Sequence, residues 1–173
     1  MKRLLIVVDM QNDFVFGCLG TPEARAILPT VKACIDSAKA DGVEVVFTRD
    51  THEENYLSTQ EGKYLPVPHC IRDTDGWQIV DGLHAGEKVF DKPVFGSETL
   101  AKYVKSGGYD EVSLIGVCTD ICVLSNAVLI KTACPETLVC VYADCCAGVT
   151  PETHAAALTT LSSIQVQIVS CSF

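Results

Sequence analysis

The sequence predicts an α/β protein with three layers: a mainly parallel sheet of about six strands, covered by helices on both faces. Short continuous apolar runs that end at polar residues alternate along the chain with segments in which apolar residues follow helical spacing. Continuous apolar runs are typical of strands that are buried on both faces, as they are in parallel sheets. Because 173 residues is a typical length for one domain, we expect residues 1–173 to form a single domain.

The first half of the chain alternates apolar runs with polar connections. Strands are predicted over residues 4–9, 43–48 and 88–90, and a helix is predicted over residues 27–40. Residues 11–20 are predicted to form a loop. Residues 51–76 form a long polar segment that contains prolines and histidines. A long irregular segment inside a compact domain is usually functional.

The second half repeats the alternation more regularly. Strands are predicted over residues 111–117, 137–143 and 165–169, and helices over residues 98–106, 120–132 and 151–162. Parallel strands joined by helices require right-handed crossovers. Ligands of such sheets bind outside the carboxyl ends of the strands, so we expect the chemistry of this protein there.

Cys122 follows one of these strand ends. The strand that ends at Val117 leads through a short polar turn directly into a predicted helix, with Thr119 or Asp120 as its N-cap. Cys122 then falls in the first helical turn, where the partial positive charge of the helix end favours a thiolate. The chain has ten cysteines, so a buried packing residue is the alternative interpretation.

Two further strand ends offer an acid and a base. Asp9 ends the first strand, and Lys92 follows the short strand over residues 88–90. Asp9 could take the proton of the Cys122 thiol and pass it to a leaving amine. Lys92 would hold both groups in their charged forms. Taken singly, such an aspartate is more often a turn residue and such a lysine is usually solvated.

The composition argues against two classes of binding partner. The net charge of −9 argues against nucleic acid or an anionic membrane surface, and no apolar run approaches the length of a membrane span. The cysteines lie largely in apolar periodic segments, which indicates free thiols in a reducing cytoplasm. Cys145 and Cys146 lack the spacing of a zinc ribbon and are interpreted as packing residues.

Three segments in chain order resemble the signature blocks of the isochorismatase-like cysteine hydrolases: Asp9–Phe14, Lys92–Ser97 and Gly116–Val123. The resemblance implies the Rossmann-like fold of that family and a catalytic triad of Asp9, Lys92 and Cys122. It also implies a cis peptide bond between Val117 and Cys118. That bond would direct the N–H groups of Cys118 and Cys122 at an oxyanion.

Asp50, His52 and His69 offer one carboxylate and two imidazoles, a donor set suited to zinc, iron or manganese. Loop histidines are mostly surface residues, so spacing alone leaves a metal site open. Segments 50–52 and 68–70 are similar to the metal-binding blocks of the nicotinamidase branch. Glu61 resembles the additional carboxylate ligand that some members of this branch use. We therefore expect a divalent metal ion, with zinc as the first candidate.

The resemblance implies hydrolysis of nicotinamide to nicotinate and ammonia through a thioester, in a homo-oligomer that serves NAD salvage; the cytoplasmic location is expected from the free thiols. Phe14 and Phe95 are expected to form walls of the substrate pocket. The branch commonly has a stacking aromatic three positions before the last histidine, where this chain has Pro66. His84 and His154 are interpreted as structural or surface residues.

Two alternatives stay open. The first is a hydrolase of another small amide or carbamoyl compound in the same family. The second is a non-catalytic binding domain that keeps the fold.

Overall fold

The computed structural model describes residues 1–171 and contains one six-stranded sheet, in the order β3-β2-β1-β4-β5-β6. Every neighbouring pair of strands is parallel, which confirms the predicted parallel sheet of about six strands. The strands are β1 (Arg3–Val8), β2 (Glu44–Asp50), β3 (Lys88–Lys92), β4 (Glu111–Val117), β5 (Leu138–Ala147) and β6 (Gln167–Val169).

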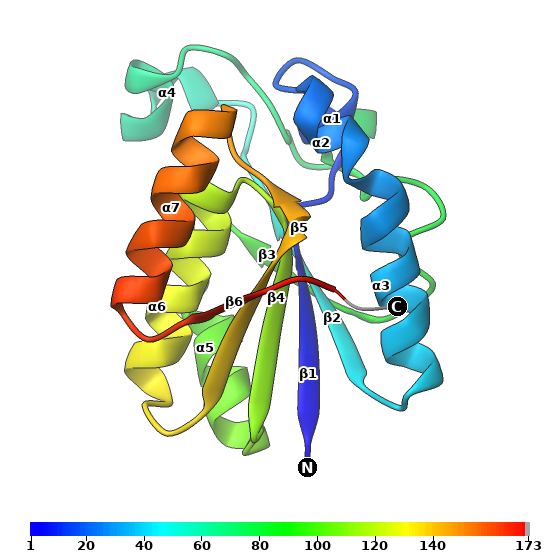
Figure 1. Cartoon of the computed structure of the whole chain (residues 1–173). Coiled ribbons are helices and arrows are strands. Elements are labelled where there is room, and N and C mark those ends of the chain that lie inside the picture. Colours follow the sequence, from blue (N-terminus) through cyan, green and yellow to red (C-terminus); the bar gives the residue numbers. More distant parts are fainter. Residues whose placement is uncertain (172–173) are drawn as a thin grey trace.

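Helices cover both faces of the sheet (Figure 1). One face carries α3, with α1 and α2 beside its amino end, and the other carries α5, α6 and α7. The α-helices are α1 (Asn12–Val15), α2 (Pro22–Ala26), α3 (Leu28–Ala40), α4 (Gln60–Tyr64), α5 (Glu98–Gly107), α6 (Leu124–Ala133) and α7 (Pro151–Ser163). Short 3₁₀ helices span Tyr56–Ser58 and Asp75–Trp77, and a π-helix spans Thr119–Val123. Within residues 1–171, no helix has both the length and the apolar character that crossing a membrane would require.

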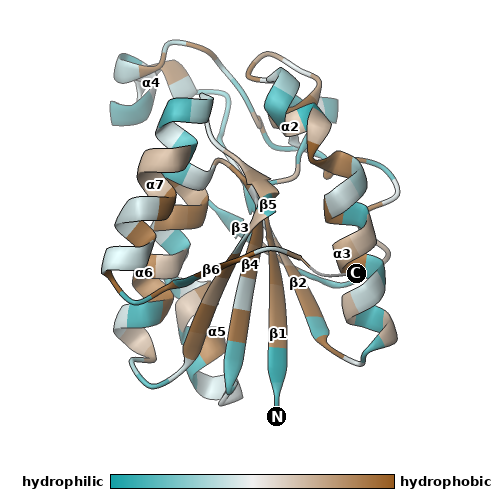
Figure 2. Cartoon of the chain, in the orientation of Figure 1, coloured by the Kyte–Doolittle hydropathy of each residue, from teal (hydrophilic) through white to brown (hydrophobic). Residues whose placement is uncertain are grey.

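The core consists of two apolar layers, one on each face of the sheet. Figure 2 shows mostly apolar strands at the centre and helices of mixed hydrophilic and apolar residues around them. Leu4, Ile6 and Val8 of β1 pack towards α5 and α6, and Leu5 and Val7 pack towards α3. This alternation follows from the two-residue side-chain period of a strand and explains why the β1 run is apolar throughout.

Gly116 lies on β4 directly beside β1. Its register partner on β1 is Val8, and its φ of +113° lies in the region that favours glycine. A Cβ atom at this position would lie 2.1 Å from the Val8 carbonyl oxygen. Glycine at position 116 therefore lets β1 and β4 reach their carboxyl ends side by side.

The structure corrects the predicted connections. The predicted loop over residues 11–20 contains α1, which is a single turn and too short to show a periodic pattern. The polar segment 51–76 contains α4 and both 3₁₀ helices. Strand β5 extends four residues beyond its predicted end, because a register shift relative to β4 lets pairing resume at residue 146.

Candidate active site

Four polar side chains lie at neighbouring carboxyl ends of the sheet. Asp9 directly follows β1, Asp50 and Lys92 are the last residues of β2 and β3, and Cys122 lies in the π-helix that follows β4. Asp50 and Lys92 are register partners, so their side chains start side by side. The exposed fractions of Asp9, Lys92 and Cys122 are 0%, 1% and 6%, so the cluster is buried.

Lys92 lies at the centre of this cluster. Its Nζ atom is 2.7 Å from Oδ2 of Asp9 and 3.4 Å from Sγ of Cys122. The same ammonium group donates to Oδ1 of Asp50, at 3.2 Å, and to the Val94 carbonyl oxygen, at 3.2 Å. The structure thus brings together the three side chains that sequence analysis placed at separate strand ends.

The two oxygens of Asp9 have different surroundings. Oδ1 accepts a hydrogen bond of 2.6 Å from the hydroxyl of Thr48. Oδ2 faces the Lys92 ammonium without hydrogen-bond alignment, and among residues 1–171 it accepts no hydrogen bond. Asp9 also has a φ of +48°, a left-handed conformation that non-glycine residues rarely adopt. One carboxylate oxygen is therefore fixed, and the other is available for a proton.

Burial controls the protonation of the cluster. It raises the pKa of the Asp9 carboxyl above its ordinary value, although the charge of Lys92 opposes the shift. Burial and the nearby Asp9 charge raise the pKa of the Cys122 thiol well above its ordinary value, again against Lys92. Burial would lower the pKa of Lys92, but Asp9, Cys122 and Asp50 together raise it. Lys92 is therefore the permanent cation, and Asp9 and Cys122 compete for a proton.

The local structure around Cys122 corrects the predicted helix start. Cys122 lies in the π-helix Thr119–Val123, whose N-cap is Cys118 without a side-chain cap bond. The Thr119 hydroxyl pairs with Nδ1 of His154, and the Asp120 carboxylate accepts the Val149 N–H. Both expected caps are thus occupied elsewhere, and α6 begins only at Leu124. The favourable charge near the sulfur comes from Lys92 and not from a capped α-helix.

The peptide bond between Val117 and Cys118 is cis. The Cys118 N–H donates to no backbone carbonyl among residues 1–171. This N–H group is therefore an available donor at the N-cap of the π-helix that contains Cys122.

A second cluster adjoins the first. Asp50, His52, Glu61 and His69 each offer one ligand atom, and these atoms lie within 4.8 Å of one another. Oδ2 of Asp50 is 2.9 Å from Nε2 of His52 and 3.5 Å from Nε2 of His69. Oε1 of Glu61 is 3.6 Å and 3.7 Å from the same two nitrogens. Two imidazoles and two carboxylates that converge in this way could hold a divalent metal ion.

The surrounding chain orients these donors. Nδ1–H of His69 donates to the Val67 carbonyl oxygen at 2.8 Å, which leaves Nε2 of that ring as the ligand atom. Glu61 lies in the first turn of α4, which the Thr59 hydroxyl caps by accepting the Gly62 N–H. No helix is predicted here from the sequence. The capped helix α4 is what places the Glu61 side chain beside the two histidines.

Asp50 links the two clusters. Oδ1 contacts Lys92, whereas Oδ2 faces the imidazoles. Burial would raise the pKa of Asp50, but hydrogen bonds from His52 and His69 and the charge of Lys92 hold it well below its ordinary value. Sequence analysis assigned Asp50 to the metal alone and missed this second role.

Gln11 is a further residue that sequence analysis missed. Its side-chain oxygen accepts the Asp50 N–H at 2.7 Å, and its side-chain nitrogen donates to the carbonyl oxygens of Asp50 and Trp77. All of these contacts are buried. Gln11 belongs to the segment Asp9–Phe14 that resembles a family signature, but nothing in the sequence indicates that its partner is the backbone of β2.

Some aromatic residues contact the histidines of the second cluster, whereas others lie exposed. The half-buried ring of Phe14 lies 5.5 Å from the His69 ring, and Tyr56 packs on both imidazoles, at 4.7 Å and 5.0 Å. Phe95, the other expected pocket wall, is 41% exposed in the segment after β3. Pro66 is exposed as well.

His84 and His154 take no part in either cluster. His84 packs edge-on against Phe47 and contacts the Glu87 carbonyl oxygen, and His154 pairs with Thr119. These contacts agree with the structural roles expected for both histidines.

Comparison with known proteins identifies the family. The Isochorismatase domain model matches residues 3–171. The nicotinamidase/pyrazinamidase of Mycobacterium tuberculosis is 30% identical over 186 residues, covering 96% of this chain and 98% of that protein. The nicotinamidase of Saccharomyces cerevisiae is 28% identical over 175 residues, covering 73% of this chain and 80% of that protein.

A solved structure agrees with the sequence relatives. The crystal structure of the pyrazinamidase of Pyrococcus horikoshii in complex with zinc superimposes with a TM-score of 0.86. Its sequence identity is 31%, and the alignment covers 99% of this chain and 100% of that chain. The chain belongs to the isochorismatase family and, within it, to the nicotinamidase-like branch.

Proposed function

We propose that this protein hydrolyses nicotinamide to nicotinate and ammonia through a thioester on Cys122. The observation that carries the proposal is the buried contact of the Lys92 ammonium with both the Asp9 carboxylate and the Cys122 sulfur. An acid, a nucleophile and a fixed cation in contact are the parts that acyl transfer from an amide requires. The nicotinamidase relatives support the choice of substrate.

Asp9 carries the proton in the first half of the reaction. Its Oδ2, which accepts no hydrogen bond among residues 1–171, takes the thiol proton, and the Cys122 thiolate attacks the carboxamide carbon. The raised pKa of Asp9 suits a group that must bind this proton and then release it to the leaving ammonia. The C–N bond breaks as ammonia departs, and the acyl group remains on sulfur as a thioester.

The second half of the reaction uses the same groups. Asp9, now ionised, accepts a proton from water as the water oxygen attacks the thioester carbon. The C–S bond breaks, nicotinate leaves, and the proton returns to the Cys122 sulfur. Throughout, Lys92 limits the energetic cost of negative charge on either partner. The N–H groups of Cys118 and Cys122 would stabilise the oxyanion of both tetrahedral intermediates.

The donors of the second cluster fit a zinc ion, which we propose as the resident metal; iron and manganese suit the same donors. Asp50, His52, Glu61 and His69 would hold it. When bound, the ion supplies a Lewis acid that can bind the ring nitrogen of the substrate and so orient the carboxamide. Phe14, which packs against His69, would form an apolar wall for the ring, with Phe95 as a second wall.

Several wider properties follow as proposals. Residues 1–173 would act as one hydrolase domain. All ten cysteines are free thiols, which supports a reducing, cytoplasmic location. Hydrolysis of nicotinamide would place the protein in NAD salvage, and we propose that it works as a homo-oligomer. Small amides, and neither nucleic acid nor membrane, would be its partners, in keeping with the net charge of −9.

Ammonia release from nicotinamide, measured with and without a metal chelator, tests the proposal. The expected result is release by the metal-loaded protein that falls when the chelator removes the ion. A panel of other amides and carbamoyl compounds, assayed in the same way, measures specificity. Faster release from a carbamoyl compound than from nicotinamide would contradict the proposed substrate but leave the hydrolase chemistry in place.

Two variants separate the nucleophile from ordinary buried thiols. Cys122→Ala should abolish ammonia release while metal content is unchanged, because the donors of the metal cluster are intact. Cys146→Ala is the matched control, since Cys146 is equally buried at 4% exposure and contacts the Leu114 carbonyl oxygen of β4. Substantial release by the Cys122 variant would refute the assignment of the nucleophile.

A further inference from the structure

Three cysteines that are far apart in the sequence meet on the α3 face of the sheet. Cys34 comes from α3, Cys145 from β5, and Cys171 from the segment that follows β6. Their three Sγ atoms lie within 4.8 Å of one another. Cys34 and Cys145 belong to the apolar layer under α3, whereas Cys122 belongs to the layer on the other face. This thiol cluster is therefore separate from the active site.

Burial and backbone contacts hold the three cysteines in place. Cys34 and Cys145 are 3% and 0% exposed, and the Cys145 thiol contacts the Thr30 carbonyl oxygen of α3 at 3.8 Å. The Cys171 N–H donates to both carboxylate oxygens of Asp144, at 2.9 Å and 3.1 Å. After β6 the chain crosses in front of the sheet towards α3 (Figure 1). That crossing delivers Cys171 to its two partners.

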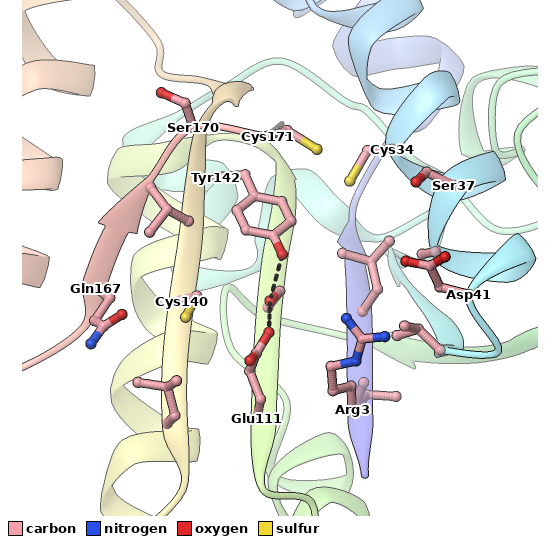
Figure 3. Close-up of a pocket in the computed structure, with 17 residues that line it drawn as sticks. Arg3, Cys34, Ser37, Asp41, Glu111, Cys140, Tyr142, Gln167, Ser170 and Cys171 are labelled. Atoms are coloured by element: carbon pink, nitrogen blue, oxygen red, sulfur yellow. Dashed lines mark hydrogen bonds between the residues drawn. The ribbon is translucent and has the colours of Figure 1, made fainter. Parts of the chain in front are cut away.

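The cluster borders a pocket that residues of α3, β1, β4 and β5 line. The pocket has a volume of about 510 Å³, and Cys34 and Cys171 are among its lining residues. Figure 3 shows the sulfur atoms of Cys34 and Cys171 pointing towards each other on the pocket wall. Cys34 and Cys171 therefore border a space that has room for a water molecule.

We propose that Cys34, Cys145 and Cys171 bind a thiophilic metal ion such as zinc, with water from the pocket as the fourth ligand. Zinc–sulfur bonds of about 2.3 Å place the sulfurs of a tetrahedral site about 3.8 Å apart, within the spacing found here. Each thiol that binds the ion releases its proton to solvent, so binding of one ion by three thiols releases three protons. The site would tie the C-terminal segment to α3 and β5.

The linear spacing of the cysteines does not reveal this site. Cys145 and Cys146 lack zinc-ribbon spacing, and under this proposal the interpretation as a packing residue applies to Cys146 alone. Side chains alternate along a strand, so Cys146 points into the opposite apolar layer while Cys145 faces α3.

Cadmium is a suitable probe, because cadmium thiolates absorb in the near ultraviolet whereas cadmium carboxylates and imidazoles do not. Metal-free protein, kept reduced, is titrated with cadmium while the absorption is recorded. In a second experiment, zinc bound per chain is counted by elemental analysis after gel filtration. We expect a thiolate band in the wild type, and one more equivalent of zinc than in a Cys34→Ser/Cys171→Ser variant, which should lack the band.

Two controls keep the outcome clear. Cys140→Ser changes a buried thiol that lines the same pocket outside the cluster, so it should keep both the band and the extra zinc. The Cys34→Ser/Cys171→Ser variant should keep its amide hydrolase activity and its zinc at Asp50, because neither cysteine contacts the active site. Retained activity also shows that this variant folds.

A measurement on the wild type alone guards against a variant that does not fold. Cadmium should slow the alkylation of Cys171, the one cysteine of the cluster that is not fully buried, as located by mass spectrometry of peptides. The proposal is overturned if cadmium gives no thiolate band or no protection of Cys171. It is also overturned if two of the three thiols resist alkylation until a reductant is added, since that result indicates a disulfide.

Discussion

Replacing Lys92 with methionine removes the cation that separates Asp9, Asp50 and Cys122. Lys92 is 1% exposed, so water cannot take its place without rearrangement. Methionine has a similar length and is apolar, so the variant tests the charge more than the packing. We expect the variant to lose stability and activity for two separate reasons.

The distances give the magnitudes. With an effective dielectric constant of 20, the attraction between Lys92 and Asp9 at 2.7 Å is about 6 kcal/mol. That between Lys92 and a Cys122 thiolate at 3.4 Å is about 5 kcal/mol. Because Asp9 can respond to the loss of Lys92 by binding a proton, the expected loss of folding free energy is about 3–5 kcal/mol. Losing this attraction raises the pKa of Cys122 further and disfavours the thiolate, which should lower kcat/KM on the order of 10³-fold.

Three assays check these values. Urea unfolding gives the stability, ammonia release gives kcat/KM, and alkylation of the Cys122 peptide as a function of pH follows the thiol. Lys88→Met is the matched control, because Lys88 begins the same strand and is exposed, with its ammonium group over the Phe90 ring. If Lys92→Met kept more than about a tenth of the wild-type kcat/KM, the role given to the Lys92 charge would be wrong.

Other predictions concern the acid, the metal and the fold. Thr48→Val removes the hydrogen bond that the Thr48 hydroxyl donates to ionised Asp9, so the pKa of Asp9 should rise. The pH profile of kcat/KM should then shift to higher pH by about one to two units. An unshifted profile contradicts the role of Asp9. Burial lowers the pKa of His69 but Asp50 and the Val67 carbonyl raise it above 6.5 overall, and only the neutral ring binds metal. Zinc affinity, measured by competition with a chelating dye, should therefore fall as pH decreases through neutrality, and an affinity that is constant from pH 8 to pH 6 would exclude His69 as a ligand. Gly116→Ala should lower the free energy of unfolding, measured by thermal unfolding, by about 3 kcal/mol or more. The alanine Cβ would overlap the Val8 carbonyl oxygen, and the backbone at this position favours glycine. A loss within about 0.5 kcal/mol would contradict this explanation of the contact.

The strand ends were predictable because burial on both faces leaves a strong signal. The run over residues 4–8 is apolar without interruption, and the first polar side chain after it, Asp9, marks the carboxyl end of β1. The same reasoning located Asp50, Lys92 and the turn before Cys122. Parallel topology then required these ends to share one edge of the sheet, which is the arrangement that the structure shows.

Contacts between distant segments were not predictable in this way. The hydroxyl of Thr119 had an equally good partner in a local helix cap and in His154, and only the packing of α7 decides between them. The helix that contains Glu61 is one turn long, too short for apolar periodicity to indicate. The Gln11 contacts and the three clustered thiols depend on register and on the path of the C-terminal segment, which no spacing in the sequence encodes.

The central claim is that Cys122 carries the acyl group during turnover. Rapid acid quenching of the protein during reaction with nicotinamide, followed by mass spectrometry of the peptides, measures this directly. We predict one nicotinoyl group on Cys122 in the wild type, and neither adduct nor ammonia from Cys122→Ala. An adduct on a different residue, or steady ammonia release by Cys122→Ala, would contradict the mechanism.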